Sequence, residues 1–442
     1  MPSPVCRECG RIPSTLASSG ASHGRHDLWV CALLFLATLL NYLDRQTISV
    51  AASKIAQDFG FNDGDLGKIF FAFLFAYGIT QIFIGSLLDR LAALYAYAFA
   101  VAAWSMAGAA VALAHGFWSL LLLRVLLGVC ESPNWPLALR VVSRIFPPSQ
   151  RSLANGVFQS GTSIGALIAP PVIIYLTNVY SWRFAFVTVG VLGIIWSALW
   201  LHGVRVRPEL RLESEQAAPE TQMVETATFL PPESPSSLRE ILSSRSLWGL
   251  MIATCFLNPL QYFYTTWLPR YFHKYAGVTF GRELAERLIA VYLALGLGLL
   301  TGGALVALLS RRLGVVSSRK TVTALGALCM VSVPAISRLA SVNGITAVIC
   351  LATFGLGWFM VNYLSFASEV SPKRVTTATG ILGGAGSLAG ASFMLLVGSS
   401  VERSGGFSSA FLMAGLMPLV ALAGIWFSTS ARQPRRASIR RS

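Results

Sequence analysis

Four ionisable side chains lie inside long apolar runs of this sequence, where they could bind an ion or carry a proton. They are Asp44, Arg45, Arg124 and Glu131. An ionisable group left in hydrocarbon costs about 2.5–3.5 kcal/mol on insertion scales, so such groups face a cavity or one another. We therefore expect these four side chains to line the centre of the molecule. The alternative is that they form structural ion pairs that lock two helices together.

The spacing between Arg124 and Glu131 is informative. Arg124 and Glu131 are seven positions apart, which is two helical turns, and so they lie on one face of a helix. Gly128 lies between them on that face and has no side chain. The pattern predicts a gap that holds either a direct contact between cation and carboxylate or a small ligand.

The composition is that of a membrane protein. Of the 442 residues, 54% are hydrophobic and only 12% are charged, about half of the roughly 25% found in soluble domains. This excludes a soluble enzyme, a disulfide-rich secreted module and a disordered chain. The net charge of +15 does not indicate a nucleic-acid partner, because the basic residues fall in breaks between apolar runs, a pattern typical of positive-inside orientation.

The apolar runs predict an all-α, multi-pass fold, since a bilayer-spanning helix needs about 20 apolar residues. Twelve such spans are expected, at 28–50, 67–88, 92–114, 118–142, 152–177, 182–202, 247–268, 287–309, 320–339, 344–366, 374–398 and 407–428. They group into a disordered tail (1–27), a six-helix bundle (28–202), a polar linker (203–246), a second six-helix bundle (247–428) and a basic tail (429–442). The charged loops place both termini and the linker in the cytoplasm.

Small residues repeat between the two halves. Gly161 and Gly165 of the first half return as Gly386 and Gly390 of the second, and such small faces let helices approach closely. Together with the matching order of the charged loops, this predicts a parallel duplication of six helices. Two such halves describe a rocking transporter.

The sequence contains no Walker loop, metal-ligand cluster or nucleophile–base set, so we expect no enzyme, no cofactor and no resident metal. Cys6 and Cys9 with His23 and His26 approach the spacing of zinc-finger ligands. The two histidines are too close together for that motif, so we expect a disordered tail there and not a zinc site.

Several softer polar residues could face a central cavity or make hydrogen bonds between helices. They are Tyr77, Gln81, Gln159, Asn258, Gln261, Tyr264, Asn362, Tyr363 and Ser387.

Three sequence segments carry a specific resemblance. They are NYLDR at 41–45, GSLLDR at 85–90 and RVLLGVCESPNWPLALRVVSRIFPPSQR at 124–151. With NGVFQSGTSIGALIAPP at 155–171, they resemble the anion:cation symporter family of the major facilitator superfamily, and most closely its bacterial sugar-acid carriers of the hexuronate and galactonate type. The resemblance implies two six-helix bundles around a central site that opens to each side in turn.

The resemblance also implies roles for individual residues. Asp44 and Glu131 match the proton-binding carboxylates of that family, and Arg45 and Arg124 match the arginines that attract the substrate carboxylate. The positions matching substrate contacts are Tyr42, Tyr77, Gln159 and Gln261.

The sequence departs from the family pattern in three places. The stretch after Arg90 lacks the usual glycine and basic residues, which puts the customary charge clamp between bundles in doubt. An asparagine common among sugar-acid carriers is replaced in the eleventh span, where Ser387 is nearby, so hydroxyl recognition is expected to differ. The seventh-span arginine of the glutamate carriers is absent, which argues against a dicarboxylate.

These observations predict a monomeric, proton-coupled symporter of a small organic anion, most simply a sugar acid, in a bacterial inner membrane. Its partners would be the anion, protons and the lipid bilayer. Two alternatives stay open: a carrier of the same family for an aromatic or dicarboxylic acid, and a non-transporting membrane receptor, since fold alone does not fix function.

Overall fold

The computed structural model describes residues 17–88, 91–146, 148–204, 242–368 and 375–430, and all the regular structure in these ranges is helical. The first half contains α1 (Ala17–Phe59), α2 (Asp63–Leu88), α3 (Ala93–Ala110), α4 (Phe117–Glu131), α5 (Asn134–Ile145), α6 (Pro148–Val179) and α7 (Trp182–Gly203). The second contains α9 (Arg245–Thr266), α10 (Leu268–Arg270), a π-helical turn (Tyr271–Tyr275), α11 (Arg282–Leu313), α12 (Val315–Met330), α13 (Val342–Ser368), α14 (Val375–Ser404) and α15 (Ser408–Ser430). The prediction of an all-helical membrane protein is confirmed.

Ten helices in the described ranges are long and apolar enough to cross a bilayer. The two expected spans outside this set are 118–142 and 247–268. The first is divided between α4 and α5, of 15 and 12 residues, because Pro133 interrupts the backbone hydrogen-bond ladder. The second, α9, is less apolar since it carries residues such as Asn258 and Gln261. These two elements also supply residues of the central site described below.

The N-terminal boundary differs from the prediction. The tail 1–27 was expected to lack regular structure, but α1 already begins at Ala17. The last proline before it is Pro13, and extending an existing helix requires no new nucleation. The predicted Cys6/Cys9 segment, the linker from 205 to 241 and the tail from 431 lie outside the described residues.

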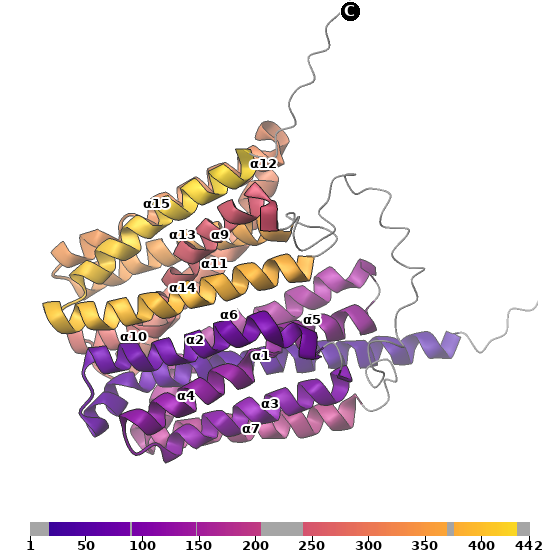
Figure 1. Cartoon of the computed structure of the whole chain (residues 1–442), viewed down its shortest axis with the longest axis horizontal. Coiled ribbons are helices and arrows are strands. Elements are labelled where there is room, and N and C mark those ends of the chain that lie inside the picture. The colour runs from indigo at the N-terminus through magenta and orange to yellow at the C-terminus, as the bar shows by residue number, and fades with distance from the viewer. Residues whose placement is uncertain (1–16, 89–90, 147, 205–241, 369–374, 431–442) are drawn as a thin grey trace, which may run out of the picture.

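The helices form two bundles that repeat the same pairing. In the first bundle α1 packs on α6, α2 on α4 and α3 on α7; in the second α9 packs on α14, α11 on α13 and α12 on α15 (Figure 1). The paired glycines lie at the first of these contacts. A Cβ on Gly165 would meet the Leu39 carbonyl of α1 at 3.0 Å, and Gly390 lies directly against the ring of Tyr262 on α9. The predicted close approach of helices at these positions is confirmed.

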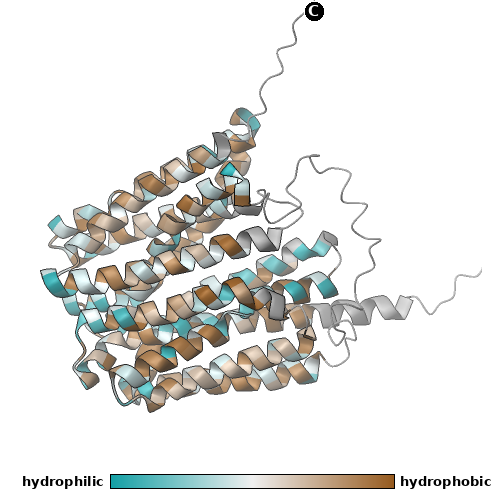
Figure 2. Ribbon diagram, in the orientation of Figure 1, coloured by the Kyte–Doolittle hydropathy of each residue, from teal (hydrophilic) through white to brown (hydrophobic). Residues whose placement is uncertain are grey.

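The bundles meet along two helix pairs, α2 with α14 and α6 with α11. Hydrophobic residues cover the middle of most helices and hydrophilic ones gather near their ends (Figure 2). Large side chains such as Phe83, Phe99 and Leu300 are exposed on the outer surface. A water-soluble protein rarely presents so extensive an apolar exterior, whereas a bilayer solvates it.

Candidate functional site

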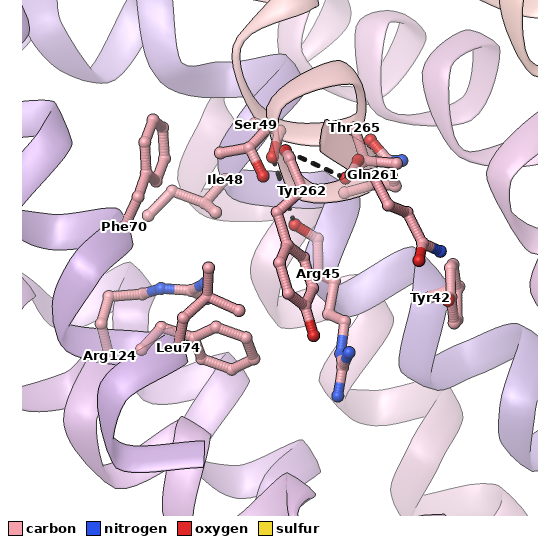
Figure 3. A pocket seen from close by; sticks show the side chains of 13 residues that line it. Tyr42, Arg45, Ile48, Ser49, Phe70, Leu74, Arg124, Gln261, Tyr262 and Thr265 are labelled. Carbon is pink, nitrogen blue, oxygen red and sulfur yellow. Dashed lines mark hydrogen bonds between the residues drawn. The ribbon is translucent and has the colours of Figure 1, made fainter. Parts of the chain in front are cut away.

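A cleft lies between the two bundles, with α1, α2 and α4 on one side and α9 on the other (Figure 3). The cleft is partly open to solvent. Its lining combines two arginines with aromatic, amide and hydroxyl groups: Tyr42, Arg45, Gln46, Ile48, Ser49, Phe70, Phe73, Leu74, Arg124, Gln261, Tyr262, Thr265 and Thr266.

The four predicted ionisable residues lie together at this cleft, which Arg45 and Arg124 line, while Asp44 and Glu131 are buried behind it. We call them, with Asn41, the central cluster: Asn41, Asp44, Arg45, Arg124 and Glu131. Glu131 is fully buried, and Arg45 donates a 2.6 Å charged hydrogen bond from Nε to its Oε2 atom. Asp44 is 3% exposed and lies against Gly108 of α3. The sequence therefore predicted the cluster correctly, although its members come from helices far apart in the chain.

The ion pair within the cluster joins two helices. Of the two possibilities that the spacing left open, a direct contact between Arg124 and Glu131 is not formed, and Glu131 pairs with Arg45 instead. Seven residues rise about 10.5 Å along a helix, so two side chains at this spacing meet only if both bend toward each other. Arg45 reaches Glu131 from the neighbouring α1 without that distortion.

The gap predicted beside Gly128 is filled by protein. A Cβ at this position would collide with the carbonyl oxygen of Phe73 and would lie 3.1 Å from the Tyr77 nitrogen. The missing side chain thus lets the backbone of α2 approach α4 closely. Gly128 positions α2 and is not the floor of a ligand site.

Six buried polar atoms of the central cluster make no hydrogen bond of ordinary geometry to any residue that the structure describes. They are both amide atoms of Asn41, Nη2 of Arg45, Nε and Nη1 of Arg124, and Oε1 of Glu131. A buried polar group without a partner costs about 1–3 kcal/mol, and more if it is charged. Arg124 is only 2% exposed and makes no ion pair in the described part of the chain. Its unused donors can bind an anion that enters from the cleft.

The other predicted site residues divide into two groups. Tyr42 and Gln261 line the cleft, and Ser387 lies behind it, with its hydroxyl 3.2 Å from that of Tyr262. Tyr77 is buried with its ring under Arg45, 4.5 Å from the guanidinium carbon.

Two predicted contacts lie away from this cleft. Gln159 is exposed and is not among the lining residues. Asn362 is buried but donates from its amide to the Trp358 carbonyl of its own helix at 2.8 Å. A polar side chain in a helix can always bond to its own backbone, which sequence alone does not distinguish from a cavity contact.

The cleft also contains residues that the sequence analysis did not single out, namely Gln46, Ser49, Phe73, Tyr262, Thr265 and Thr266. A helical period would have found several of them. Ser49 follows Tyr42 by two turns on α1, and Thr265 follows Gln261 by one turn on α9. Tyr262 projects from the second bundle toward the arginines of the first (Figure 3).

A second charged group joins the bundles at the end where α2 begins, which we call the Asp63 end. Asp63 accepts hydrogen bonds from Arg270 Nε at 2.9 Å, Lys274 Nζ at 2.5 Å and Tyr275 Oη at 2.7 Å. Burial and the bond to Asp63 raise the pKa of the Tyr275 hydroxyl, which keeps it a donor. We call these four residues the Asp63 cluster. The sequence analysis did not single out these four residues, which lie at or between helix ends.

Within the described ranges, no group of three or more histidine, cysteine or acidic side chains could hold a metal ion. At the central site, guanidinium groups are able to bind an anion and carboxyl groups are able to bind a proton.

Comparison with known proteins bears on this arrangement. The chain is 29% identical to the hexuronate transporter of Escherichia coli K12 over 402 residues, covering 90% of this chain and 93% of that protein. It is 31% identical to the hexuronate transporter of Bacillus subtilis 168, covering 89% and 92%. It is 27% identical to the D-galactonate transporter of Escherichia coli O6:H1, covering 91% and 95%.

A solved structure supports the fold. An inward-facing, unoccupied bacterial homologue of the lysosomal transporter Spinster superposes with a TM-score of 0.68 at 18% identity, covering 92% of this chain and 95% of that one. The family model of the Major Facilitator Superfamily matches residues 34–394, which confirms the resemblance found in the sequence. The chain is a transporter and not an enzyme, and it belongs to the Major Facilitator Superfamily.

Proposed function

We propose that this protein is a proton-coupled symporter that imports a sugar acid with a single carboxylate, such as a hexuronate or an aldonate, across a bacterial inner membrane. The observation that carries the proposal is the buried, unpaired guanidinium of Arg124 at the cleft. The names of the relatives, which include hexuronate and galactonate transporters, favour a sugar acid as the anion.

The two sides of the cleft suit the two ends of such a molecule. A carboxylate can accept hydrogen bonds from the unused donors of Arg124 and Arg45, and charge-assisted bonds of this kind are about twice as strong as neutral ones. The facing wall from α9 offers the neutral groups of Gln261, Tyr262 and Thr265, which suit sugar hydroxyls. The absence of a cation among the lining residues of that wall favours one carboxylate over two.

Charge balance at the central cluster supports coupling to protons. With Asp44, Arg45, Arg124 and Glu131 all ionised, the cluster is neutral, so a substrate anion alone would leave a negative charge in a poorly solvated site. A proton that binds with the anion restores neutrality. Protonation of Glu131 would also break its ion pair with Arg45 and release a second arginine for the substrate. Each ligand then favours binding of the other, which is the linkage a symporter needs.

The orientation follows from the same proposal. We assign the end where α7 ends and α9 begins to the cytoplasm, as the positive-inside rule requires. The Asp63 end then faces outward, and its ion pairs between bundles hold the outer side closed. The structure would then be an inward-facing state of an alternating-access cycle.

Uptake by purified protein in proteoliposomes tests the proposal. With an inward proton gradient, labelled D-galacturonate should accumulate, and a protonophore should abolish accumulation. Unlabelled galactonate should compete, whereas galactarate and phthalate should compete poorly. Preference for galactarate or phthalate would support the dicarboxylic or aromatic alternative. Binding without counterflow would support a receptor, and accumulation insensitive to the protonophore would exclude proton coupling.

A further inference from the structure

An aromatic platform on α2 underlies the two arginines of the central cluster. Phe73 and Tyr77 are one helical turn apart, and their rings stack with centroids 6.1 Å apart and planes 21° apart. The guanidinium carbon of Arg124 lies 4.2 Å from the centroid of Phe73, and that of Arg45 lies 4.5 Å from the centroid of Tyr77. Arg45 is also within 5.5 Å of the Phe73 centroid.

The close approach of two helices builds this platform. Because Gly128 has no side chain, the α2 backbone at Phe73 and Tyr77 lies directly against α4, which carries Arg124 one turn earlier. A side chain at position 128 would push α2 away and remove the rings from the guanidinium groups. The sequence marked Gly128 as a gap for a ligand, whereas the structure gives it this architectural role.

The two arginines differ in how their charge is compensated. Arg45 has a carboxylate partner, Glu131, at 2.6 Å, in addition to the Tyr77 ring. Arg124 makes no ion pair in the described residues, and its Nε and Nη1 atoms have no hydrogen-bond partner. The negative face of an aromatic ring attracts a cation, and this attraction strengthens when water is excluded. The Phe73 ring therefore stabilises the Arg124 charge directly, in addition to the carboxylates of Glu131 and Asp44, which act on it from beyond ion-pair distance.

An aromatic ring can stabilise the positive charge of a guanidinium group without occupying its hydrogen-bond donors. Carboxylates bind guanidinium groups in the plane of the fork, whereas an aromatic ring binds the flat face. An acidic partner would compete with an incoming anion for the same donors, and a ring would not. We propose that Phe73 is a positioning residue for substrate binding, which holds the Arg124 guanidinium charged, oriented and free at its edge for the carboxylate. This inference rests on the proposed function.

Progressive fluorination of the Phe73 ring tests the proposal. Fluorine withdraws electron density from the ring and makes its face less negative, with little change in shape. Phenylalanine with one, two or three fluorines would be introduced at position 73 of the full-length protein. We expect the logarithm of the D-galacturonate dissociation constant to rise with each fluorine, and Phe73→Leu to weaken binding about 3-fold to 30-fold. Phe73→Tyr, which keeps the ring, should retain most of the affinity.

Phe75 provides the matched control, because it lies on the same helix, is 42% exposed and stacks on Phe71 away from the arginines. The same fluorinated series at position 75 should leave binding unchanged. Thermal unfolding of the ligand-free protein supplies a second measurement that needs no substrate, and its midpoint should fall stepwise with fluorination at 73 only.

The outcomes separate the two proposals. If no sugar acid binds the unmodified protein but stability falls with fluorination at 73, the proposed substrate is wrong and the role of the ring in holding Arg124 stands. If D-galacturonate binds and neither affinity nor stability responds to fluorination at 73, Phe73 is only a packing residue and the inference is overturned. A response of equal size at position 75 would also overturn it.

Discussion

Two groups of charges in the described part of the chain are built around buried carboxylates, and they differ in how completely their hydrogen bonds are satisfied. In the Asp63 cluster one carboxylate accepts from three donors on the opposite bundle, and no side-chain atom of this cluster is buried without a partner among the described residues. In the central cluster, by the same measure, six buried polar atoms lack partners. The Asp63 cluster therefore satisfies its hydrogen bonds internally, while the central cluster, at the cleft, has donors and acceptors that are not used.

Under the proposed function, this contrast separates a contact that holds the two bundles together from a site that binds a ligand. Removing one partner of a buried ion pair costs about 3–5 kcal/mol, so the Asp63 cluster resists separation of the bundles at its end. Unpaired buried donors are themselves costly, so the central cluster gains stability when something fills it. Variants in the two groups should therefore have different effects.

The largest effect is expected from Glu131→Gln in the central cluster. Glutamine cannot exchange a proton, so uphill uptake of D-galacturonate should be abolished while some exchange of labelled for unlabelled substrate remains. Proton-driven accumulation and counterflow in proteoliposomes measure the two activities separately. Retained accumulation would exclude Glu131 as a coupling site.

Asp63→Asn should come next and should affect conformation and not coupling. The change leaves Arg270 and Lys274 facing a neutral amide, and we expect the outer side to open more readily by up to about 3–5 kcal/mol. Labelling of a cysteine placed at Ser49 with an impermeant maleimide, added from the Asp63 side, reports this opening. Asp65→Asn is the control, since Asp65 is only paired with Lys68 on its own helix. Equal labelling in both variants would argue against the Asp63 cluster as a closure.

Arg124→Lys tests the anchor itself. Lysine keeps the charge but cannot reproduce the planar fork of two parallel hydrogen bonds. We expect normal folding with substrate binding weakened by about 1.5–3 kcal/mol, the scale of a hydrogen bond to a charged group. Titration of D-galacturonate into the purified variant measures the loss. Wild-type affinity in a well-folded variant would end the anchor hypothesis.

The smallest effect is expected from Glu402→Gln at the periphery of the Asp63 end. Glu402 accepts a 2.8 Å hydrogen bond from Asn62 across the bundles, but both side chains are exposed. Exposed polar contacts contribute about 0–1 kcal/mol, so transport and Ser49→Cys labelling should change less than about fivefold. If Glu402→Gln increased labelling as much as Asp63→Asn does, the exposed contact would be as important for closure as the buried one.

Local chemistry was enough to predict much of this protein from its sequence. The lengths of the apolar runs predicted the helical membrane fold. The bilayer core contains no water to hydrogen-bond the backbone, and a helix satisfies its own N–H and C=O groups. The cost of burying charge identified Asp44, Arg45, Arg124 and Glu131 as a central group. Paired glycines on α6 and α14 indicated where helices approach each other, since a missing side chain is visible in the sequence.

The partners of these residues were decided only by the tertiary structure. Helical periodicity shows which residues share a face but not which neighbouring helix covers that face. The sequence therefore left open a contact between Arg124 and Glu131, whereas the structure pairs Glu131 with Arg45 of α1. It also left open what lies beside Gly128, where α2 and the Phe73 ring pack. Asp63 meets Arg270 across 207 positions of the chain, and such a contact arises from the docking of two folded bundles, which no local pattern encodes.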